Sequence, residues 1–298
     1  MSAYKTVYNK SYALVVGIDE YENLPPLLTA VRGASAIADL LQNRYGFETK
    51  TLFNDHATQE NILGWFNSLD CDSDDQVLFY FAGHGMTRKT TSHEIGYLAI
   101  SKTVRGEYQT AIKTESIIDE AQILNAKHVL ILLDACFSGL ALTRAAQDDD
   151  FNVQKVVDSL ISRSVRYIIT AGGVEVVDDN AAPGGHYSIF TYYLLRGLRG
   201  DITPKEGFIR ARQLANYLEE RVSGSRSSKH KPNHGYLEGS GDGDFVLTIP
   251  ENLIHDEDTF ELCIVHDPSK IFDGEDHKIS LLSRFQKLMD FRVLERIT

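Results

Sequence analysis

Short apolar runs alternate along the chain with longer segments in which apolar residues recur at helical spacing. Residues 12–18 (YALVVGI) are almost continuously apolar, which is typical of a strand buried on both faces. Residues 30–45 place apolar side chains at intervals of three and four, and Gly46 follows as a helix stop. The same reasoning predicts further strands at 48–53, 76–82, 128–134, 166–171 and 244–248, and further helices at 58–68, 114–124, 188–198 and 208–222.

This alternation of strands and helices predicts an α/β fold with a mostly parallel sheet covered on both faces. Residues 223–243 are rich in Gly and Ser and predict a mobile loop. Residues 251–298 follow Pro250 with a charge-dense texture, which indicates a small C-terminal appendage that regulates the protein or binds a partner. We therefore expect one domain over residues 1–250, followed by this appendage.

Composition narrows the classes of function. Of the 298 residues 43% are hydrophobic and 24% are charged, as in a globular protein with a sizeable core. A formal charge of −12 argues against nucleic acid, because phosphate binding needs a concentrated basic surface. The first apolar run is too short to cross a bilayer, so we expect no membrane association. The three cysteines, Cys71, Cys136 and Cys263, form no CxxC pair, which favours a reduced, cytoplasmic setting.

Two of the predicted buried strands end in residues with catalytic chemistry. The strand at 76–82 runs into GHG at 83–85, and the strand at 128–134 runs into DACFSG at 134–139. The carboxyl ends of parallel strands share one edge of a sheet, and active residues gather there. We therefore expect His84 and Cys136 to meet, although they are 52 positions apart in the sequence.

The chemistry of the two side chains explains the pairing. A thiol with a pKa of about 8.5 is mostly protonated at neutral pH, so nucleophilic attack needs a nearby base. An imidazole with a pKa of about 6.5 can also protonate a departing amine. The backbone N–H groups of Gly85 and Cys136 are candidate donors to an oxyanion. The sequence thus predicts a cysteine endopeptidase with Cys136 as nucleophile and His84 as acid/base.

At these segments the chain resembles the caspase/metacaspase family of cysteine peptidases, in which a GHG segment carries the histidine and a DxCxSG segment the cysteine. The likeness covers about residues 10–250 and includes YALVVGIDEY, RYIITAGG, YSIFTYYLLRGL and NHGYLEGSGDGDFVL. It implies a caspase-like three-layer sandwich, with a six-stranded mostly parallel sheet flanked by helices. A large-subunit-like part at about 10–145 would precede a small-subunit-like part at about 165–250.

The resemblance also implies a substrate class. Asp134, two residues before Cys136, occurs in metacaspases and bacterial relatives, which cleave after arginine or lysine, and a carboxylate would pair with either cation. Metacaspases usually carry a second pocket acid, but the matching stretch here is RGA at 32–34. We expect arginine to be preferred over lysine. The acids that could replace the missing one follow the fifth predicted strand: Glu175, Asp178 and Asp179.

A peptidase inside a cell needs restraint, so we expect a latent zymogen acting in cell-death or defence signalling. Many relatives cut themselves between the cysteine strand and the next strand. The basic residues of that interval are Arg144, Lys155, Arg163 and Arg166. Residues 251–298 would receive the activating signal, either a regulatory protein or a small signalling ligand. The substrate is a protein or peptide, and we expect no metal or organic cofactor.

Other interpretations remain open. A catalytically silent caspase-like scaffold would use the same fold to bind a protein partner. A non-peptidase enzyme on a doubly wound sheet would need a nucleotide fingerprint, and no GxGxxG or GxxxxGK[ST] pattern is present. The three acids at 148–150 lack the alternating spacing of a calcium loop. The pairs His230/His234 and Cys263/His266 supply too few ligands for a zinc site.

Overall fold

The chain divides into two compact units, Met1–Leu253 and Ile254–Thr298. The computed structural model describes residues 8–136, 162–172, 179–202, 208–225, 228, 230–238, 240–241 and 243–248, all within the first unit. The expected appendage at 251–298 therefore lies outside the described residues.

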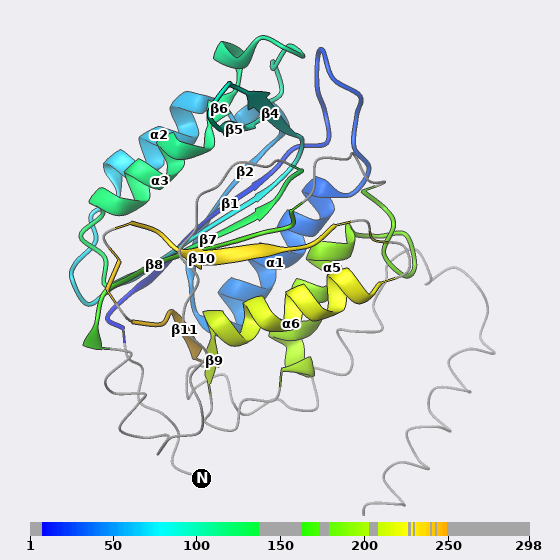
Figure 1. Ribbon diagram of the computed structural model, residues 1–298. Coiled ribbons are helices and arrows are strands. Elements are labelled where there is room, and N and C mark those ends of the chain that lie inside the picture. The colour runs from blue at the N-terminus through cyan, green and yellow to red at the C-terminus, as the bar shows by residue number, and fades with distance from the viewer. Residues whose placement is uncertain are drawn as a thin grey trace, which may run out of the picture. The chain divides into compact units, whose positions relative to one another are not determined.

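The central sheet has six strands. Their bounds are β1 Ser11–Gly17, β2 Glu48–Phe53, β3 Gln76–Ala82, β7 His128–Asp134, β8 Val165–Thr170 and β10 Asn233–Tyr236. They lie in the order β10-β8-β7-β3-β1-β2, and only β10 pairs antiparallel with its neighbour. The expected six-stranded, mostly parallel sheet is confirmed (Figure 1).

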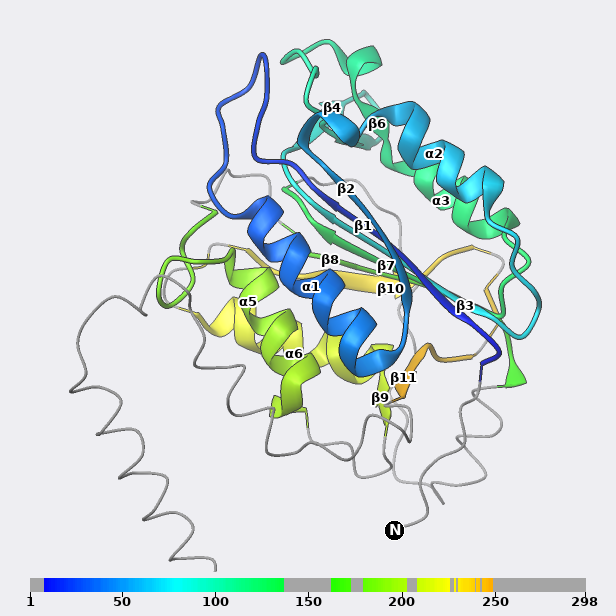
Figure 2. The ribbon, with the colours of Figure 1, turned by 180° about the vertical axis from the view of Figure 1, so that it is seen from behind.

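Helices cover both faces of this sheet. In the described ranges the α-helices are α1 Ala30–Tyr45, α2 Gln59–Ser68, α3 Thr114–Ile123, α5 Ile189–Arg196 and α6 Ala211–Gly224, and the short helices are η1 Asn54–His56, η2 Tyr108–Thr110 and η3 Gly197–Asp201. The helices α2 and α3 lie on one face, and α1, α5 and α6 lie on the other (Figures 1 and 2). This gives the three layers of a caspase-like sandwich.

The strand β3 shows why the middle of the sheet is almost entirely apolar. All seven of its residues are buried, because each face of the strand meets a helical layer. Phe79 and Phe81 belong to the hydrophobic core that also holds Phe66 of α2. Tyr80 points the other way, and its hydroxyl lies 2.5 Å from that of Thr191 on α5. Successive side chains of β3 thus point alternately to the two faces of the sheet, and each set packs against the helices on its own side.

Two helix starts illustrate how the sequence fixes local structure. The hydroxyl of Thr58 accepts a hydrogen bond from the Asn61 N–H at 3.1 Å, so Thr58 caps the start of α2. At α1 the carboxylate of Asp19, which follows β1, accepts hydrogen bonds from the N–H groups of Ala30 and Val31 at 2.7 and 3.2 Å. The first core strand and the first helix are therefore joined at the edge of the sheet that carries the site.

A second sheet was not predicted. It contains β4 Gly85–Lys89, β5 Glu94–Leu98 and β6 Ile112–Lys113 in that order. Its strands are short, and β4 has no buried residue, so no apolar run marks it in the sequence. Because β4 begins at Gly85, this sheet anchors the chain directly after His84.

The strand predicted at 244–248 forms only at residues 246–248, and it lies outside the central sheet. Residues 246–248 form β11 (Val246–Thr248), which pairs antiparallel with β9 (Phe208–Arg210) in a separate two-stranded sheet. The sixth strand of the central sheet is β10, inside the segment that we expected to be a loop. The predicted helix at 208–222 accordingly begins three residues later, at Ala211, because β9 occupies its first three positions.

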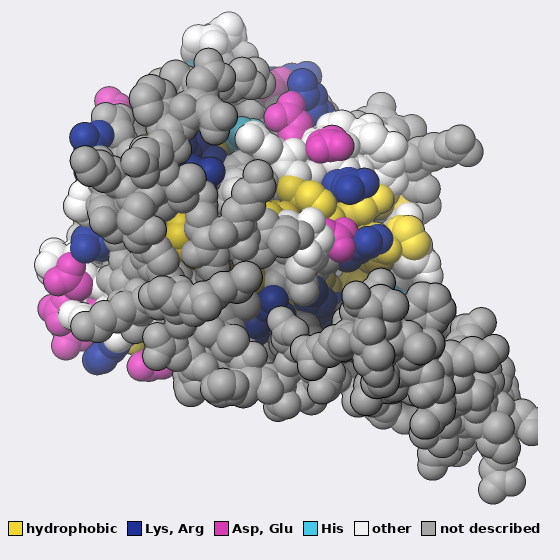
Figure 3. Space-filling model, turned by 90° about the horizontal axis from the view of Figure 1, so that it is seen from below, with side chains coloured by type: hydrophobic (Ala, Val, Ile, Leu, Met, Phe, Trp, Pro, Cys, Tyr) yellow, Lys and Arg dark blue, Asp and Glu magenta, His cyan; other side chains and the backbone are white. Residues whose placement is uncertain are grey.

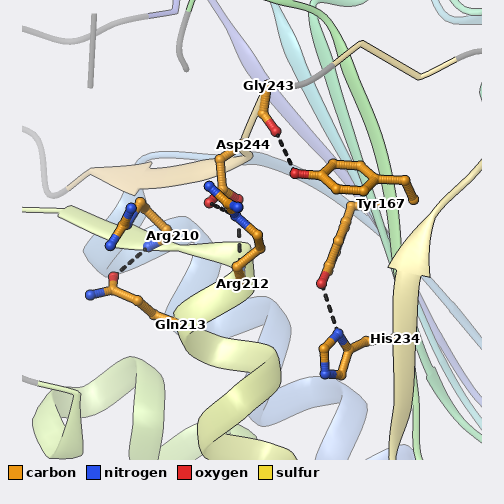
Figure 4. Close-up of polar contacts among 8 residues, drawn as sticks. Tyr167, Arg210, Arg212, Gln213, His234, Gly243 and Asp244 are labelled. Atoms are coloured by element: carbon orange, nitrogen blue, oxygen red, sulfur yellow. Dashed lines mark hydrogen bonds and ion pairs between the residues drawn. The ribbon is translucent and has the colours of Figure 1, made fainter. Parts of the chain in front are cut away.

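A buried ion pair joins this small sheet to α6. Asp244 is 1% exposed, and its carboxylate lies 3.0 Å from Nε of Arg212. Figure 4 shows the two side chains facing each other beside the start of α6. Burial raises the pKa of Asp244, and the Arg212 charge opposes that rise.

On the face seen in Figure 3, acidic and basic side chains surround a hydrophobic area of the described surface.

His128, at the start of β7, forms a second buried polar link. Its Nε2 lies 2.8 Å from the carbonyl oxygen of Arg163, so this nitrogen carries the proton, and its Nδ1 accepts from the Tyr8 hydroxyl at 2.5 Å. The N–H of Val246 donates in turn to the Tyr8 oxygen. Burial lowers the pKa of His128 to about 4, which keeps the ring neutral.

Candidate active site

The strands β3 and β7 deliver the two candidate catalytic residues to one edge of the sheet. Ala82 and Asp134, the last residues of these strands, are paired across the sheet. The N–H of Gly83 donates to the carbonyl oxygen of Asp134 at 3.2 Å. His84 and Cys136 each follow two residues after a member of that pair, and both line one cavity.

Glycine at position 85 allows this close approach. A Cβ at Gly85 would overlap the carbonyl oxygen of Cys136, and it would lie 2.8 Å from the carbonyl carbon and 3.2 Å from the nitrogen. A Cβ at Gly83 would lie 2.6 Å from the hydroxyl oxygen of Tyr21. The GHG segment is therefore required by the contacts that its backbone makes with Cys136 and Tyr21.

His84 is held by its main chain and by its ring. Its N–H donates to the hydroxyl oxygen of Tyr21 at 2.9 Å, and the two rings lie 4.8 Å apart between centroids. Nε2 of His84 lies 2.8 Å from the carbonyl oxygen of Pro25. A carbonyl only accepts, so Nε2 carries the proton, and Nδ1 is the basic nitrogen of the neutral ring.

The cavity that holds both residues also contains acidic and hydroxyl groups. Its lining includes the ends of β3 and β7, the residue after β8, the starts of α1 and α5, part of α6, and the segment before β10. The polar and ionisable side chains of this lining are Thr29, His84, Asp134, Cys136, Asp179, Ser188, Ser228 and His230. Leu27, Ile189, Phe190 and Val222 add apolar surface. A cavity lined by both polar and apolar side chains suits a peptide substrate that inserts one charged side chain.

Asp134 is fixed by the hydroxyls of Ser188, the N-cap of α5, and of Thr191 in its first turn. One carboxylate oxygen accepts from Ser188 and, at 2.5 Å, from Thr191. Burial raises the pKa of Asp134, while these hydrogen bonds and the charge of His230 oppose the rise. Gly33 belongs to the RGA stretch at 32–34, which matches the place of the second pocket acid in metacaspases. A Cβ at Gly33 would lie 3.0 Å from Cγ2 of Thr191, so there is little room for an acidic side chain at this position of α1.

Asp179 is the one replacement acid that the structure describes, and it lines the same cavity. Its carboxylate accepts from the N–H groups of Leu28 and Thr29 at 2.5 and 2.7 Å, so it also fixes the chain before α1. Glu175 and Asp178 lie outside the described residues.

Two of the four basic residues considered for self-processing lie in the described part of the chain. The carbonyl oxygen of Arg163 is bound to buried His128. Arg166 lies inside β8, and its guanidinium donates to the carbonyl oxygens of Leu124, Ala126, Lys127 and Val165. These contacts disfavour cleavage after either residue in the folded protein. Arg144 and Lys155 lie outside the described residues.

Several residues of the site were missed in the sequence. Tyr21, Ser188 and Thr191 fall in segments that resemble the family, but nothing in their spacing marks a role in holding His84 or Asp134. His230 was weighed only as a zinc ligand, yet its Nε2 lies 3.8 Å from Sγ of Cys136. Helical periodicity at 188–198 would have placed Ser188 as the cap of α5, and it does accept from the Thr191 N–H at 2.9 Å.

Within the described ranges, no group of three His, Cys, Asp or Glu side chains is arranged to hold a metal ion. None of the described helices is both long enough and apolar enough to cross a membrane.

The geometry of a cysteine and a histidine at two adjoining strand ends agrees with the family comparison. A model described as caspase domain, of a peptidase family, matches residues 10–236. The chain belongs to the caspase domain family. The general activity of this family is that of a peptidase. No curated protein sequence matches the chain.

Solved structures share the fold of this caspase-domain protein. Caspase-1 from Spodoptera frugiperda has 14% identity and a TM-score of 0.54, over 82% of this chain and 94% of that one. Protein GSU0716 from Geobacter sulfurreducens has 16% identity and a TM-score of 0.51, over 82% and 95%. The Drosophila initiator caspase Dronc has 12% identity and a TM-score of 0.50, over 78% and 81%. At such identities the likeness concerns the fold.

Proposed function

We propose that this caspase-domain protein is a cysteine endopeptidase that cleaves after arginine or lysine. The observation that carries the proposal is the shared cavity, which Cys136, His84 and the half-buried carboxylate of Asp134 all line at the ends of β3 and β7. A nucleophile, an acid/base and a cation-binding group are the three elements that such a reaction needs.

The roles follow from the contacts. The Cys136 thiolate attacks the carbonyl carbon of the peptide bond, and the amides of Gly85 and Cys136 are the proposed donors to the developing oxyanion. Nε2 of His84 is bound to Pro25, so Nδ1 is the nitrogen that exchanges a proton with the leaving amine and then with water. Hydrolysis of the thioester releases the acyl group and restores the cysteine.

Asp134 supports the preference for a basic residue. Because its carboxyl group is held by Ser188 and Thr191 in a half-buried position, it presents an acid at a fixed place to a side chain that enters the cavity. Asp179 adds a second acid to the same lining. A guanidinium pairs better than an ammonium with a fixed carboxylate, since it offers two parallel donors. Arginine is therefore preferred over lysine.

Regulation belongs to the same proposal. The protein is kept inactive until the chain is cleaved in the interval between Cys136 and β8. Arg144 and Lys155 are the remaining candidates for that cleavage. A protein or a small ligand acting through residues 251–298 supplies the signal, in a cell-death or defence response.

The test is a set of fluorogenic peptides that end in Arg, Lys, Gln or Asp, incubated with the wild-type protein and with Cys136→Ala. The expected result is cleavage of the Arg peptide first and the Lys peptide second, with no turnover by Cys136→Ala. An arginyl chloromethyl ketone should label Cys136. Absence of both cleavage and labelling, with and without cleavage of the interval by added trypsin, would favour a silent scaffold that binds a protein partner.

A further inference from the structure

Cys136 has a second imidazole beside it. Nε2 of His230 lies 3.8 Å from Sγ of Cys136, although the two residues are 94 positions apart. Both residues line the cavity that contains His84. His230 comes just before β10, whose antiparallel pairing with β8 starts at Asn233 and Thr170. Sheet pairing thus brings this histidine to the nucleophile.

The orientation of the His230 ring is fixed by its other nitrogen. Nδ1 of His230 contacts the carbonyl oxygen of Gly172, which follows β8. Since a carbonyl can only accept, Nδ1 carries the proton, and the basic nitrogen of the neutral ring is Nε2. That nitrogen is the one that faces the sulfur, so the ring is in the tautomer that can take a proton from the thiol.

The backbone contact between the two segments is close. Gly172 has φ +71°, and a Cβ there would overlap the carbonyl oxygen of Lys231 and lie 2.8 Å from its carbonyl carbon. Only glycine suits both this conformation and this contact. The chain on either side of the His230–Gly172 hydrogen bond is therefore packed together, which holds the imidazole at the sulfur.

Two acidic side chains share the cavity with His230. The other titratable side chains of the cavity are His84, Asp134 and Asp179, two of them carboxyls. The ammonium of neighbouring Lys231 lies 3.4 Å from the Glu219 carboxylate of α6, which compensates its charge. A positive charge on His230 would therefore have two acids and the thiolate as compensation.

We propose that His230 is the base that deprotonates Cys136, and that its imidazolium remains the partner of the thiolate while His84 serves the leaving group. This division of labour rests on the endopeptidase function proposed above. The S–H bond of Cys136 breaks with its electron pair left on sulfur, and the proton binds Nε2 of His230. Nδ1–H stays on the Gly172 carbonyl.

The rest of the cycle balances through His84. A protonated His84 gives its Nδ1 proton to the departing amine as the thioester forms, and becomes neutral. It then takes a proton from the water that attacks the thioester, which restores its charge. The thiolate that leaves in this step returns to the imidazolium of His230. The net reaction consumes one peptide bond and one water molecule.

The experiment measures how fast iodoacetamide alkylates Cys136 at each pH, by mass spectrometry of the peptide that contains it. His230→Asn removes the nitrogen that faces the sulfur and keeps an amide donor for the Gly172 carbonyl. His230→Gln places at the sulfur an amide that cannot carry a proton. His84→Gln is the matched control at the other imidazole. All three are compared with the wild-type protein.

The proposal predicts that the alkylation midpoint of both His230 variants rises by at least one pH unit, toward the ordinary thiol value of about 8.5. At pH 7 the alkylation rate should fall about tenfold in these variants, and His84→Gln should keep the wild-type midpoint. Unchanged midpoints in the His230 variants would overturn the proposal. So would a rise in His84→Gln as large as theirs.

Two features keep this result separate from the peptidase assignment. Alkylation needs no substrate, so it reports on His230 even if no peptide is cleaved. Failure of the peptide assay with a raised midpoint in the His230 variants would contradict the endopeptidase function alone. Cys71 is 7% exposed in the same fold, so its resistance to iodoacetamide shows that each variant is folded. Because His230→Asn preserves the Gly172 contact, it is the variant expected to keep that resistance.

Discussion

Gly85 and Cys136 touch through their backbones, with space at position 85 for a hydrogen atom and for nothing larger. A Cβ there would lie 2.8 Å from the carbonyl carbon of Cys136 and still nearer its oxygen. This contact fixes the distance between the turn that carries His84 and the turn that carries Cys136. The same Cβ would lie 3.2 Å from the Cys136 nitrogen, so the two residues whose amides are proposed for the oxyanion are neighbours.

Gly85→Ala should therefore damage the site more than the fold. The new methyl group must push the Cys136 turn away from β4, and we expect kcat/KM to fall at least tenfold because misplacement of about 1 Å has large effects on catalysis. Gly64→Ala is the control, since a Cβ at Gly64 of α2 would meet no atom within 4 Å. That substitution should leave kcat/KM unchanged and stabilise the helix by about 0.5–1 kcal/mol. Equal activity of the two variants would contradict the importance of the contact.

Tyr21→Phe should weaken the hold on His84. The change removes the acceptor of the His84 N–H and leaves that group unsatisfied, at a cost of about 1–3 kcal/mol in the free energy of unfolding. We expect a lower kcat, measured with the Arg peptide, and a lower denaturant midpoint. Tyr192→Phe is the matched control, because the Tyr192 hydroxyl contacts exposed Arg196 at 3.4 Å. Tyr21 has no positioning role if the two variants have the same kcat.

Asp134→Asn should change which residue is cleaved. The amide keeps an oxygen for Ser188 and Thr191 but removes the negative charge, so the ratio of kcat/KM for Arg over Gln peptides should fall at least tenfold. Asp39→Asn, at an exposed position of α1, removes one charge without touching the cavity. Its ratio should equal that of the wild type. A preserved ratio in Asp134→Asn would show that another group binds the basic side chain.

The stability of the fold should depend on pH through His128. Its folded pKa of about 4 lies below the ordinary value of 6.5, so between these two values the unfolded chain binds a proton that the native protein does not. Stability is then fully present above pH 6.5 and is lost as the pH falls toward 4, by about 3 kcal/mol in total. Urea unfolding at a series of pH values measures this loss. His128→Gln cannot titrate and should show a shallower pH dependence; parallel curves for the two proteins would contradict the assignment.

The buried strands and the two turns that carry His84 and Cys136 were predictable because they depend on local pattern. The continuous apolar runs of β3 and β7 indicate strands in the middle of the sheet, buried on both faces. The carboxyl ends of neighbouring parallel strands lie at the same edge of the sheet. The resemblance to the family at the GHG and DACFSG segments pointed to the same edge. Asp134 was recognised with them, since it is the last residue of β7.

The remaining features depend on contacts between distant parts of the chain. β10 reads NHGY, a sequence with weak strand preference, and it becomes a strand through its hydrogen bonds with β8. The more strand-like VLT of β11 pairs instead with β9. Because the place of β10 was missed, the contact of His230 with Cys136 could not be foreseen. Tyr21 and Thr191 likewise gain their roles only after α1 and α5 pack on the sheet.

A double-mutant cycle at Cys136 and His84 tests most directly whether the two residues act on the same bond. It compares kcat/KM for the Arg peptide in the wild type, Cys136→Ala, His84→Ala and the double variant. Groups that act as a unit are strongly non-additive, so each single variant should lose about as much activity as the double variant. Losses that multiply in the double variant, or a Cys136→Ala protein that still cleaves the peptide, would contradict the account.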